Sequence, residues 1–242
     1  MFDFDSRLSD APFVEAIWHT RSEGVGPSFI SVAATHWEMV VTRQYGHVTF
    51  TVRGPETKAS TAPIPQNAEF LGIIFKLGTY MPALPVKDLV DGGINLPEAA
   101  NQSFWLHGST WQLPNFDNAD TFVDRLVRQG LLTREPIVAE VLQRQIPHKD
   151  LSIRSMQRRF LRATGLTQGA VYQIQRARLA MTFLQRGISI HDTVDQAGYA
   201  DQPHLTRALR RFMGQTPAQI IMLNRSGALP LTSPTNPLSD AG

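Results

Sequence analysis

Apolar and polar residues alternate along residues 1–116 with the period of two that is typical of β-strands. The alternation is clearest at residues 47–53, which follow a similar segment, 37–42, across a Tyr45-Gly46 turn. Two alternating segments around such a short turn predict a β-hairpin. Further segments of this character are 13–20 and 70–77. Because glycine and proline punctuate the gaps, we expect a β-rich, barrel-like N-terminal domain.

Helical spacing of apolar residues replaces this alternation from residue 117 onward. We expect a connecting helix within 117–132 and an all-helical domain at 133–225 that buries its own apolar stripes. Serine or threonine stands at the expected start of three helices, and glycine at the expected ends. These residues are Ser152, Thr167, Ser189, Gly165, Gly187 and Gly214. The proline-rich residues 226–242 predict a flexible tail, so the fold class is α+β with two domains.

Charge is divided unevenly between the two parts of the chain. Residues 1–133 hold 9 Lys and Arg against 14 Asp and Glu, a net charge of −5. Residues 134–225 hold 14 against 6, a net charge of +8, and only one of those 14 is lysine. Arginine presents a planar fork that matches phosphate and guanine, so the imbalance favours nucleic-acid binding by the helical part. The alternative is that the charge only keeps the protein soluble.

Residues 198–217, GYADQPHLTRALRRFMGQTP, combine a Gly-aromatic turn, a basic helix and a Gly-x-Thr-Pro ending. This segment resembles the second DNA-binding motif of the AraC/XylS family of bacterial transcription regulators. Residues 151–167 repeat the pattern, since each copy has Arg-Arg-Phe followed by Gly-x-Thr. The family carries two helix-turn-helix motifs joined by one long helix, and the helix expected at 168–185 stands in that position.

The resemblance implies which side chains contact DNA. By the family pattern they are Arg154, Gln157, Arg158, Gln202, Thr206, Arg207 and Arg210. The alternative is that an arginine-rich helix face is simply solvated, but two matched copies with the right spacer favour DNA contact. Two features depart from the pattern: the connection 146–151 exceeds the usual turn of 3–4 residues, and Pro203 replaces a polar residue. Both leave open how the two motifs share the readout.

In this family the N-terminal part typically holds an effector site or a dimer contact, and residues 75–89 resemble one such N-terminal domain type. Aromatic and polar residues that could line a small-molecule pocket are Trp18, His36, Trp37, Glu38 and His47. The alternative is that the aromatic residues fill the core of the domain. A metal site at His36, Glu38 and His47 is disfavoured because no His-x-His accompanies them, so we expect no metal and no cofactor.

The remaining composition excludes several functions. The chain has no cysteine, which excludes disulfides, thiol redox sensing and cysteine nucleophiles. We find no Gly-x-Ser-x-Gly, P-loop or Gly-x-Gly-x-x-Gly motif, so we expect no enzymatic activity. The acidic N-terminus lacks an apolar leader, and the longest apolar run, 70–75, is too short to span a bilayer, so we expect a cytoplasmic protein without membrane contact.

These observations predict a sequence-specific DNA-binding transcription regulator, modulated by a small ligand in the N-terminal domain. Its expected partners are double-stranded promoter DNA, an unidentified effector, RNA polymerase and a second copy of the chain. The expected class of regulator is an activator, and the residues themselves give neither the operator, the effector nor the direction of regulation. The alternative function is a small-molecule-binding or enzymatic β-barrel whose degenerate helical appendage does not bind DNA.

Overall fold

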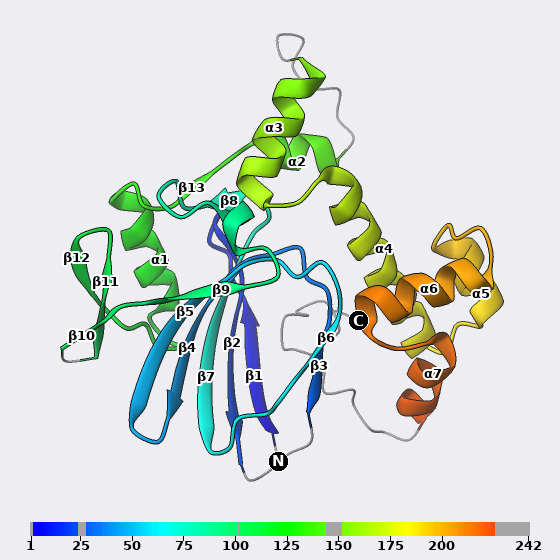
Figure 1. Cartoon of the computed structure of the whole chain (residues 1–242), viewed down its shortest axis with the longest axis horizontal. Coiled ribbons are helices and arrows are strands. Elements are labelled where there is room, and N and C mark those ends of the chain that lie inside the picture. Colours follow the sequence, from blue (N-terminus) through cyan, green and yellow to red (C-terminus); the bar gives the residue numbers. More distant parts are fainter. Residues whose placement is uncertain (1, 24–27, 101, 144–151, 226–242) are drawn as a thin grey trace. The chain divides into compact units, whose positions relative to one another are not determined.

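The structure of the chain is a computed structural model that describes residues 2–23, 28–100, 102–143 and 152–225 (Figure 1). The chain divides into two compact units, each with its own internal contacts. The first comprises Met1–Gly26, His36–Pro55 and Pro65–Gln168. The second comprises Pro27–Thr35, Glu56–Ile64 and Gly169–Gly242. The units therefore cross the expected sequence boundary at residue 133, and two short N-terminal segments belong to the same unit as the C-terminal helices.

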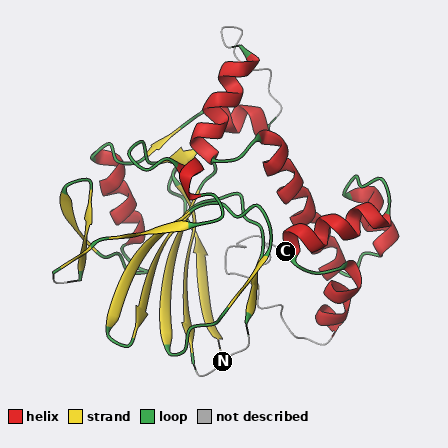
Figure 2. Ribbon diagram, viewed as in Figure 1, coloured by secondary structure: helices red, strands yellow, loops and turns green. Residues whose placement is uncertain are grey.

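The first unit is built on a six-stranded antiparallel sheet, drawn as yellow arrows in Figure 2. In spatial order its strands are β1 (Phe2–Leu8), β2 (Val14–Ser22), β7 (Ala68–Phe75), β4 (Glu38–Gln44), β5 (His47–Arg53) and β9 (Gly93–Leu96). The predicted hairpin is confirmed, because β4 and β5 pair from Glu38↔Arg53 to Gln44↔His47. Its turn places Tyr45 at φ 50° and Gly46 at φ 78°, the left-handed backbone that such two-residue turns require.

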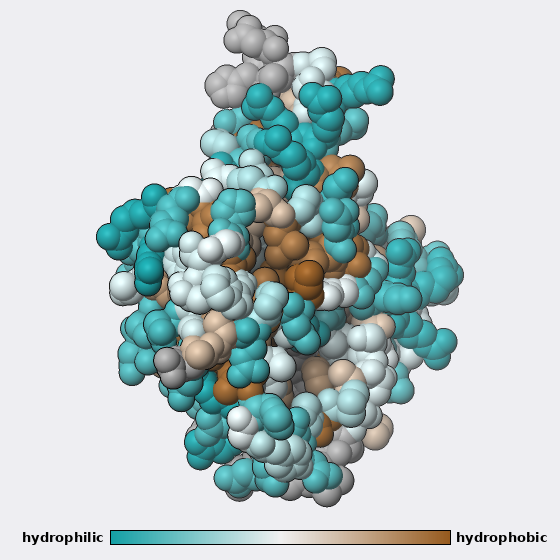
Figure 3. Space-filling model, turned by 60° about the vertical axis from the view of Figure 1, so that its left-hand side comes forward, coloured by the Kyte–Doolittle hydropathy of each residue, from teal (hydrophilic) through white to brown (hydrophobic). Residues whose placement is uncertain are grey.

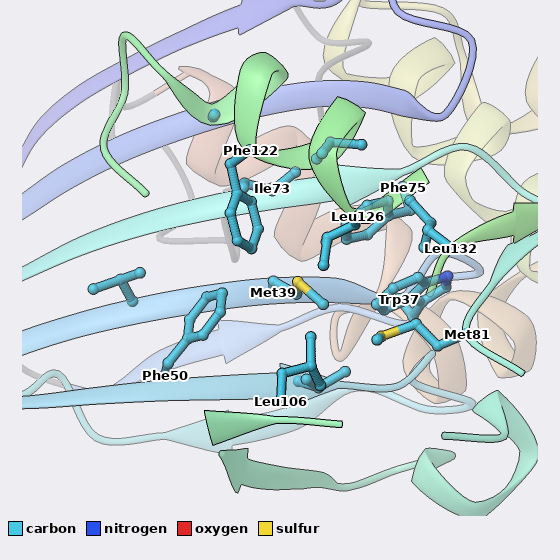
Figure 4. Packing of buried hydrophobic residues seen from close by; sticks show 14 of the residues in the cluster. Trp37, Met39, Phe50, Ile73, Phe75, Met81, Leu106, Phe122, Leu126 and Leu132 are labelled. Atoms are coloured by element: carbon cyan, nitrogen blue, oxygen red, sulfur yellow. The ribbon is translucent and has the colours of Figure 1, made fainter. Parts of the chain in front are cut away.

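The core of this unit lies on one face of the sheet (Figure 4). Helix α1 (Ala119–Arg128) covers it with Phe122, Val123 and Leu126, all buried. A three-stranded sheet contributes Phe104, from β11, and Trp111, from β12, to the same cluster. Its strands are β10 (Glu98–Ala99), β11 (Ser103–Leu106) and β12 (Ser109–Gln112). The segment expected to be only a connecting helix thus supplies a layer of the N-terminal core.

The expectation of a barrel-like domain is wrong in one respect, because the large sheet is not closed. Among the described residues its edge strands are β1 and β9, which pair with β2 and β5 and not with each other. A barrel buries its interior by joining its edges, whereas this sheet buries one face under a helix and a second sheet. Strand alternation indicates which residues share a face but does not specify whether the edges meet, so the sequence pattern fitted either outcome.

The first unit continues into the first basic helix. Strand β8 (Thr79–Tyr80) pairs with β13 (Thr133–Arg134), and the short 3-10 helix η1 is formed by Val86–Leu89. Helices α2 (Ile137–Leu142) and α3 (Ile153–Thr164) follow. The 146–151 connection, whose length departs from the family pattern, lies outside the described residues, as does the tail at 226–242.

The second unit holds the remaining helices and a two-stranded antiparallel sheet. Its helices are α4 (Gln168–Gln185), α5 (Ile190–Gln196), α6 (Gln202–Met213) and α7 (Pro217–Arg225). The expected long helix at 168–185 is confirmed by α4. The sheet consists of β3 (Phe29–Ser31) and β6 (Ser60–Ala62). We call the two segments that contain these strands, residues 28–35 and 56–64, the ribbon.

Candidate nucleic-acid interface

Helices α5 and α6 form a helix-turn-helix whose turn and caps follow from the sequence. Ser189 accepts a hydrogen bond from the Asp192 amide at the start of α5, and the Asp201 carboxylate accepts one of 2.6 Å from the His204 amide at the start of α6. Such caps satisfy amides that have no partner within the helix. Gly214 ends α6 in the left-handed conformation, at φ 71°. The caps therefore fix α6 at both ends of the basic segment.

The turn before α6 is held by an arginine from the long helix. The Arg176 guanidinium of α4 lies 4.2 Å from the centroid of the Tyr199 ring and donates a hydrogen bond of 3.2 Å to the Gly198 carbonyl. Burial raises the pKa of the Tyr199 hydroxyl, an effect that Arg176 partly opposes. The Tyr199 ring also meets His204 edge to face at 5.1 Å. The turn is thus packed against both α4 and α6, which gives α6 a defined direction.

Helix α6 has one buried face and one exposed basic face. Leu205, Leu209 and Phe212 are buried, as the sequence pattern predicts. Of the expected DNA contacts on this helix, Gln202, Arg207 and Arg210 are exposed and Thr206 is half-buried. Arg211 is not among the expected contacts, yet it is also exposed and lies one helical turn after Arg207. The spacing of four residues between Arg207 and Arg211 is the sequence signal that places both on the same side of the helix.

Helix α3 has the same division of faces. The Ser152 hydroxyl accepts a hydrogen bond from the Ser155 amide, and Gly165 ends the helix at φ 72°. Phe160 and Ala163 are buried, and the half-buried Met156 lies one turn before Phe160. The three expected contacts, Arg154, Gln157 and Arg158, are all exposed. Helices α3 and α6 are called the reading helices below, because they carry all seven expected DNA contacts.

A buried carboxylate anchors α3 to the unit that carries it. Glu135 is 8% exposed and lies 3.9 Å from Arg159 and 3.5 Å from Arg162, measured between charged atoms. Arg162 also lies over the Tyr80 ring at 5.4 Å from its centroid and donates a hydrogen bond to the Tyr80 hydroxyl. Two of the basic residues on α3 are therefore engaged by protein groups. No local sequence pattern indicates this anchor, because Glu135 and Tyr80 lie outside α3 and its flanking turns.

Two of the expected pocket residues, Trp18 and Glu38, lie together on the second face of the large sheet, which is the face opposite the main core. Trp18 is buried in a small cluster with Ala16, Val40 and Ile74, and its Nε1 donates a hydrogen bond of 3.2 Å to a Glu38 carboxylate oxygen. The other Glu38 oxygen lies 3.6 Å from the Arg53 guanidinium. The indole lies across Gly72, where a Cβ atom would be 2.0 Å from the ring. Only glycine at position 72 leaves space for this orientation of Trp18.

The other three expected pocket residues lie elsewhere. Trp37 belongs to the main core, where its ring stacks on Phe75 at 4.0 Å and its Nε1 donates to the Thr79 carbonyl. His36 is half-buried, two residues before Glu38. His47 is exposed at the opposite end of the β4–β5 hairpin, six residues along the strand from the position paired with Glu38 and roughly 20 Å away. The structure therefore does not assemble the five residues into a single pocket, nor His36, Glu38 and His47 into a metal site.

The face of the molecule drawn in Figure 3 is mainly hydrophilic. In the space-filling view most of the visible side chains are teal or pale, with brown apolar areas between them (Figure 3). None of the helices in the described ranges combines the length and apolar character needed to cross a membrane.

The comparisons with known proteins concern the segment that contains both reading helices. Residues 149–221 match the family model described as a helix-turn-helix domain. The match begins just before α3 and ends within α7, so it includes both motifs and α4. No curated protein and no solved structure matches the chain.

Proposed function

We propose that this AraC-type helix-turn-helix protein, a DNA-binding transcription regulator, recognises a specific duplex sequence with its reading helices α3 and α6. The observation that carries the proposal is the exposed basic face of α6, with Gln202, Arg207 and Arg210 outside and an apolar face buried. The major groove of B-DNA admits an α-helix, in which arginine pairs with guanine and glutamine with adenine. A helix capped at both ends and packed on one side presents these groups in fixed positions.

Helix α3 supports a second contact on the same duplex. Arg154, Gln157 and Arg158 offer the same donor types as α6, and the Glu135 carboxylate engages two other arginines of the helix, Arg159 and Arg162. Two reading helices that enter successive major-groove faces lie about 34 Å apart along DNA. We therefore propose a footprint of about two helical turns, with affinity from arginine–phosphate contacts and specificity from base contacts.

The test starts from a duplex selected by the full chain from a random pool. Binding to that duplex and to a scrambled duplex of equal length is measured over a series of salt concentrations. We expect tight, salt-dependent binding to the selected duplex and weaker binding to the scrambled one. Counterion release favours binding to either duplex, whereas base contacts add affinity only for the selected duplex. Failure to enrich any sequence, with no salt-dependent binding, would favour the alternative of a ligand-binding or enzymatic domain with a non-binding helical appendage.

Arg158→Ala tests whether α3 contributes to the readout. We expect the variant to lose protection at one end of the footprint on the selected duplex, whereas Arg207→Ala loses protection at the other end. Arg128→Ala is the control, because it removes the same charge from an exposed position on α1. A footprint confined to one turn and unchanged by Arg158→Ala would leave α6 as the single reading helix.

We also propose that a small effector binds the N-terminal unit at the second face of the large sheet. Trp18, Glu38 and Arg53 support this proposal, since they combine an aromatic surface with a buried carboxylate and a cation. A pocket that fixes a ligand needs a few such polar groups on an apolar wall. Activation, contact with RNA polymerase and self-association stay predictions from the family.

The effector proposal is tested by screening small molecules for a rise in melting temperature and following the hits by tryptophan fluorescence. We expect a true effector to change the emission of the wild-type protein and to change it much less in Trp18→Phe, because Trp18 lies at the proposed site. Hits that act equally on both proteins would argue against this face of the sheet.

A further inference from the structure

The C-terminal carbonyls of reading helix α6 are bound by residues from the N-terminal half of the sequence. A helix leaves its last four carbonyls without partners of its own. At α6, Gly214 donates to the Arg210 carbonyl at 3.2 Å, as expected for a glycine that ends a helix. The next two carbonyls are bound by the ribbon: Ala59 N–H donates to Arg211 O at 2.8 Å, and Ala33 N–H donates to Phe212 O at 2.7 Å. Each of the two segments of the ribbon thus supplies one amide, Ala33 from the segment with β3 and Ala59 from the segment with β6.

The Ala33 peptide also connects α6 with the long helix α4. Its amide binds α6, and its carbonyl accepts a hydrogen bond of 2.9 Å from Arg178 Nε of α4. Burial lowers the pKa of Arg178 to about 10, and the nearby Glu56 carboxylate partly opposes this shift, so the guanidinium remains charged at neutral pH. A hydrogen bond from a charged group is stronger than one between neutral groups. The ribbon is thus bound both to reading helix α6 and to the long helix α4.

The end of α6 fits closely against the ribbon. A Cβ atom built on Gly214 would lie 2.8 Å from a methyl group of Ile30 and 3.2 Å from Cβ of Ala59. The ribbon is held together by the β3–β6 pairing and by a second bridge between Ala34 and Glu56. Because the contact has no room for an additional side chain, a shift of the ribbon would require a shift of the end of α6.

We propose that the ribbon is a working part of the DNA-binding unit and positions reading helix α6 by capping its C-terminus. Along the chain, β3 lies between β2 and β4, and β6 lies between β5 and β7. All four of those neighbouring strands belong to the large sheet. The ribbon is therefore the covalent route by which a change in the sheet reaches α6, without passing through the helices between them in sequence. This inference rests on the proposed function, because it assumes that α6 reads DNA.

A double-mutant cycle tests the positioning role of the ribbon in the full chain. Arg207→Ala is expected to reduce affinity for the selected duplex roughly 5- to 150-fold in the wild-type background. In the Arg178→Gln background we expect that reduction to fall to about threefold or less, because α6 no longer holds Arg207 in register with its base. The control background is Arg186→Gln, which removes the same charge just after the end of α4, and in which the full effect of Arg207→Ala should remain.

Two features of the cycle separate positioning from simple stabilisation. If Arg178→Gln only lowered the stability of the protein, the affinity losses caused by Arg158→Ala and by Arg207→Ala would shrink alike. If it removes the cap of α6, only the affinity loss caused by Arg207→Ala should shrink. Arg178→Lys keeps the charge but lacks the planar fork, so we expect it to recover the coupling only in part. If folded Arg178→Gln retains the full effect of Arg207→Ala, the inference is wrong even though DNA recognition stands. If the wild-type chain selects no duplex, the proposed function itself fails.

Hydrogen exchange of the wild-type protein gives a test that needs no variant. We expect the amides of Ala33 and Ala59 to exchange slowly, and to slow further when the selected duplex binds, in parallel with the amides of α6. The amides of the β4–β5 hairpin serve as the internal reference. Exchange at Ala33 and Ala59 that is unaffected by the duplex, while α6 becomes protected, would overturn the proposal.

Discussion

Arg207→Ala is expected to weaken binding to the selected duplex by about 1–3 kcal/mol and to relax the preference at one base pair. Arg207 is exposed near the middle of the basic face of α6, with the buried Leu205 and Leu209 fixing that face outward. If Arg207 pairs with a guanine, as we propose, the variant loses both hydrogen bonds of that pair.

The measurement is a binding titration of wild type and variant on the selected duplex and on every single-base change of its central positions. Arg128→Ala again controls for the loss of one positive charge. Base contact predicts a loss on the selected duplex that largely disappears when the contacted base pair is changed. An equal loss on selected and random duplexes would mean that Arg207 contacts only phosphate.

A fragment of residues 133–225 is expected to be less stable than the same residues in the full chain and to bind the selected duplex less tightly. The sequence predicts an independent domain with these bounds, and the fragment tests that prediction directly. The fragment lacks Tyr80 and η1, which pack against α3, and it lacks the ribbon that caps α6. Each hydrogen bond lost is worth about 1 kcal/mol, so the loss of the Ala33 and Ala59 bonds alone is substantial for a small domain.

Circular dichroism and melting curves of the fragment and the full chain would measure this effect, together with titrations on the selected duplex. We expect the helical signal of the fragment to melt at a lower temperature and its affinity to drop at least several-fold. A fragment that equals the full chain in both measurements would show that the ribbon and η1 are dispensable, and would support the sequence boundary at residue 133.

The sequence by itself determined the local elements of this protein. Apolar spacing and capping residues specified α3 and α4 to within a residue or two, and Gly214 specified where α6 ends, because Ser152, Gly165 and Gly214 act on their own turns. The period of two in 47–53 specified β5 and its hairpin partner for the same reason. Exposure of the expected DNA contacts on α3 and α6 also followed, except at the half-buried Thr206, since the apolar stripe of a helix fixes which side is buried.

Only the tertiary structure decided which distant segments these elements meet. Whether the large sheet closes, which face of it receives Trp18 and which core receives Trp37 depend on pairings that strand alternation leaves equivalent. The Glu135 anchor of α3 and the Ala33 cap of α6 join residues up to 179 positions apart. Such contacts are made by backbone amides and single side chains that carry no local periodic signal, so the residue types near them give no indication of the partner.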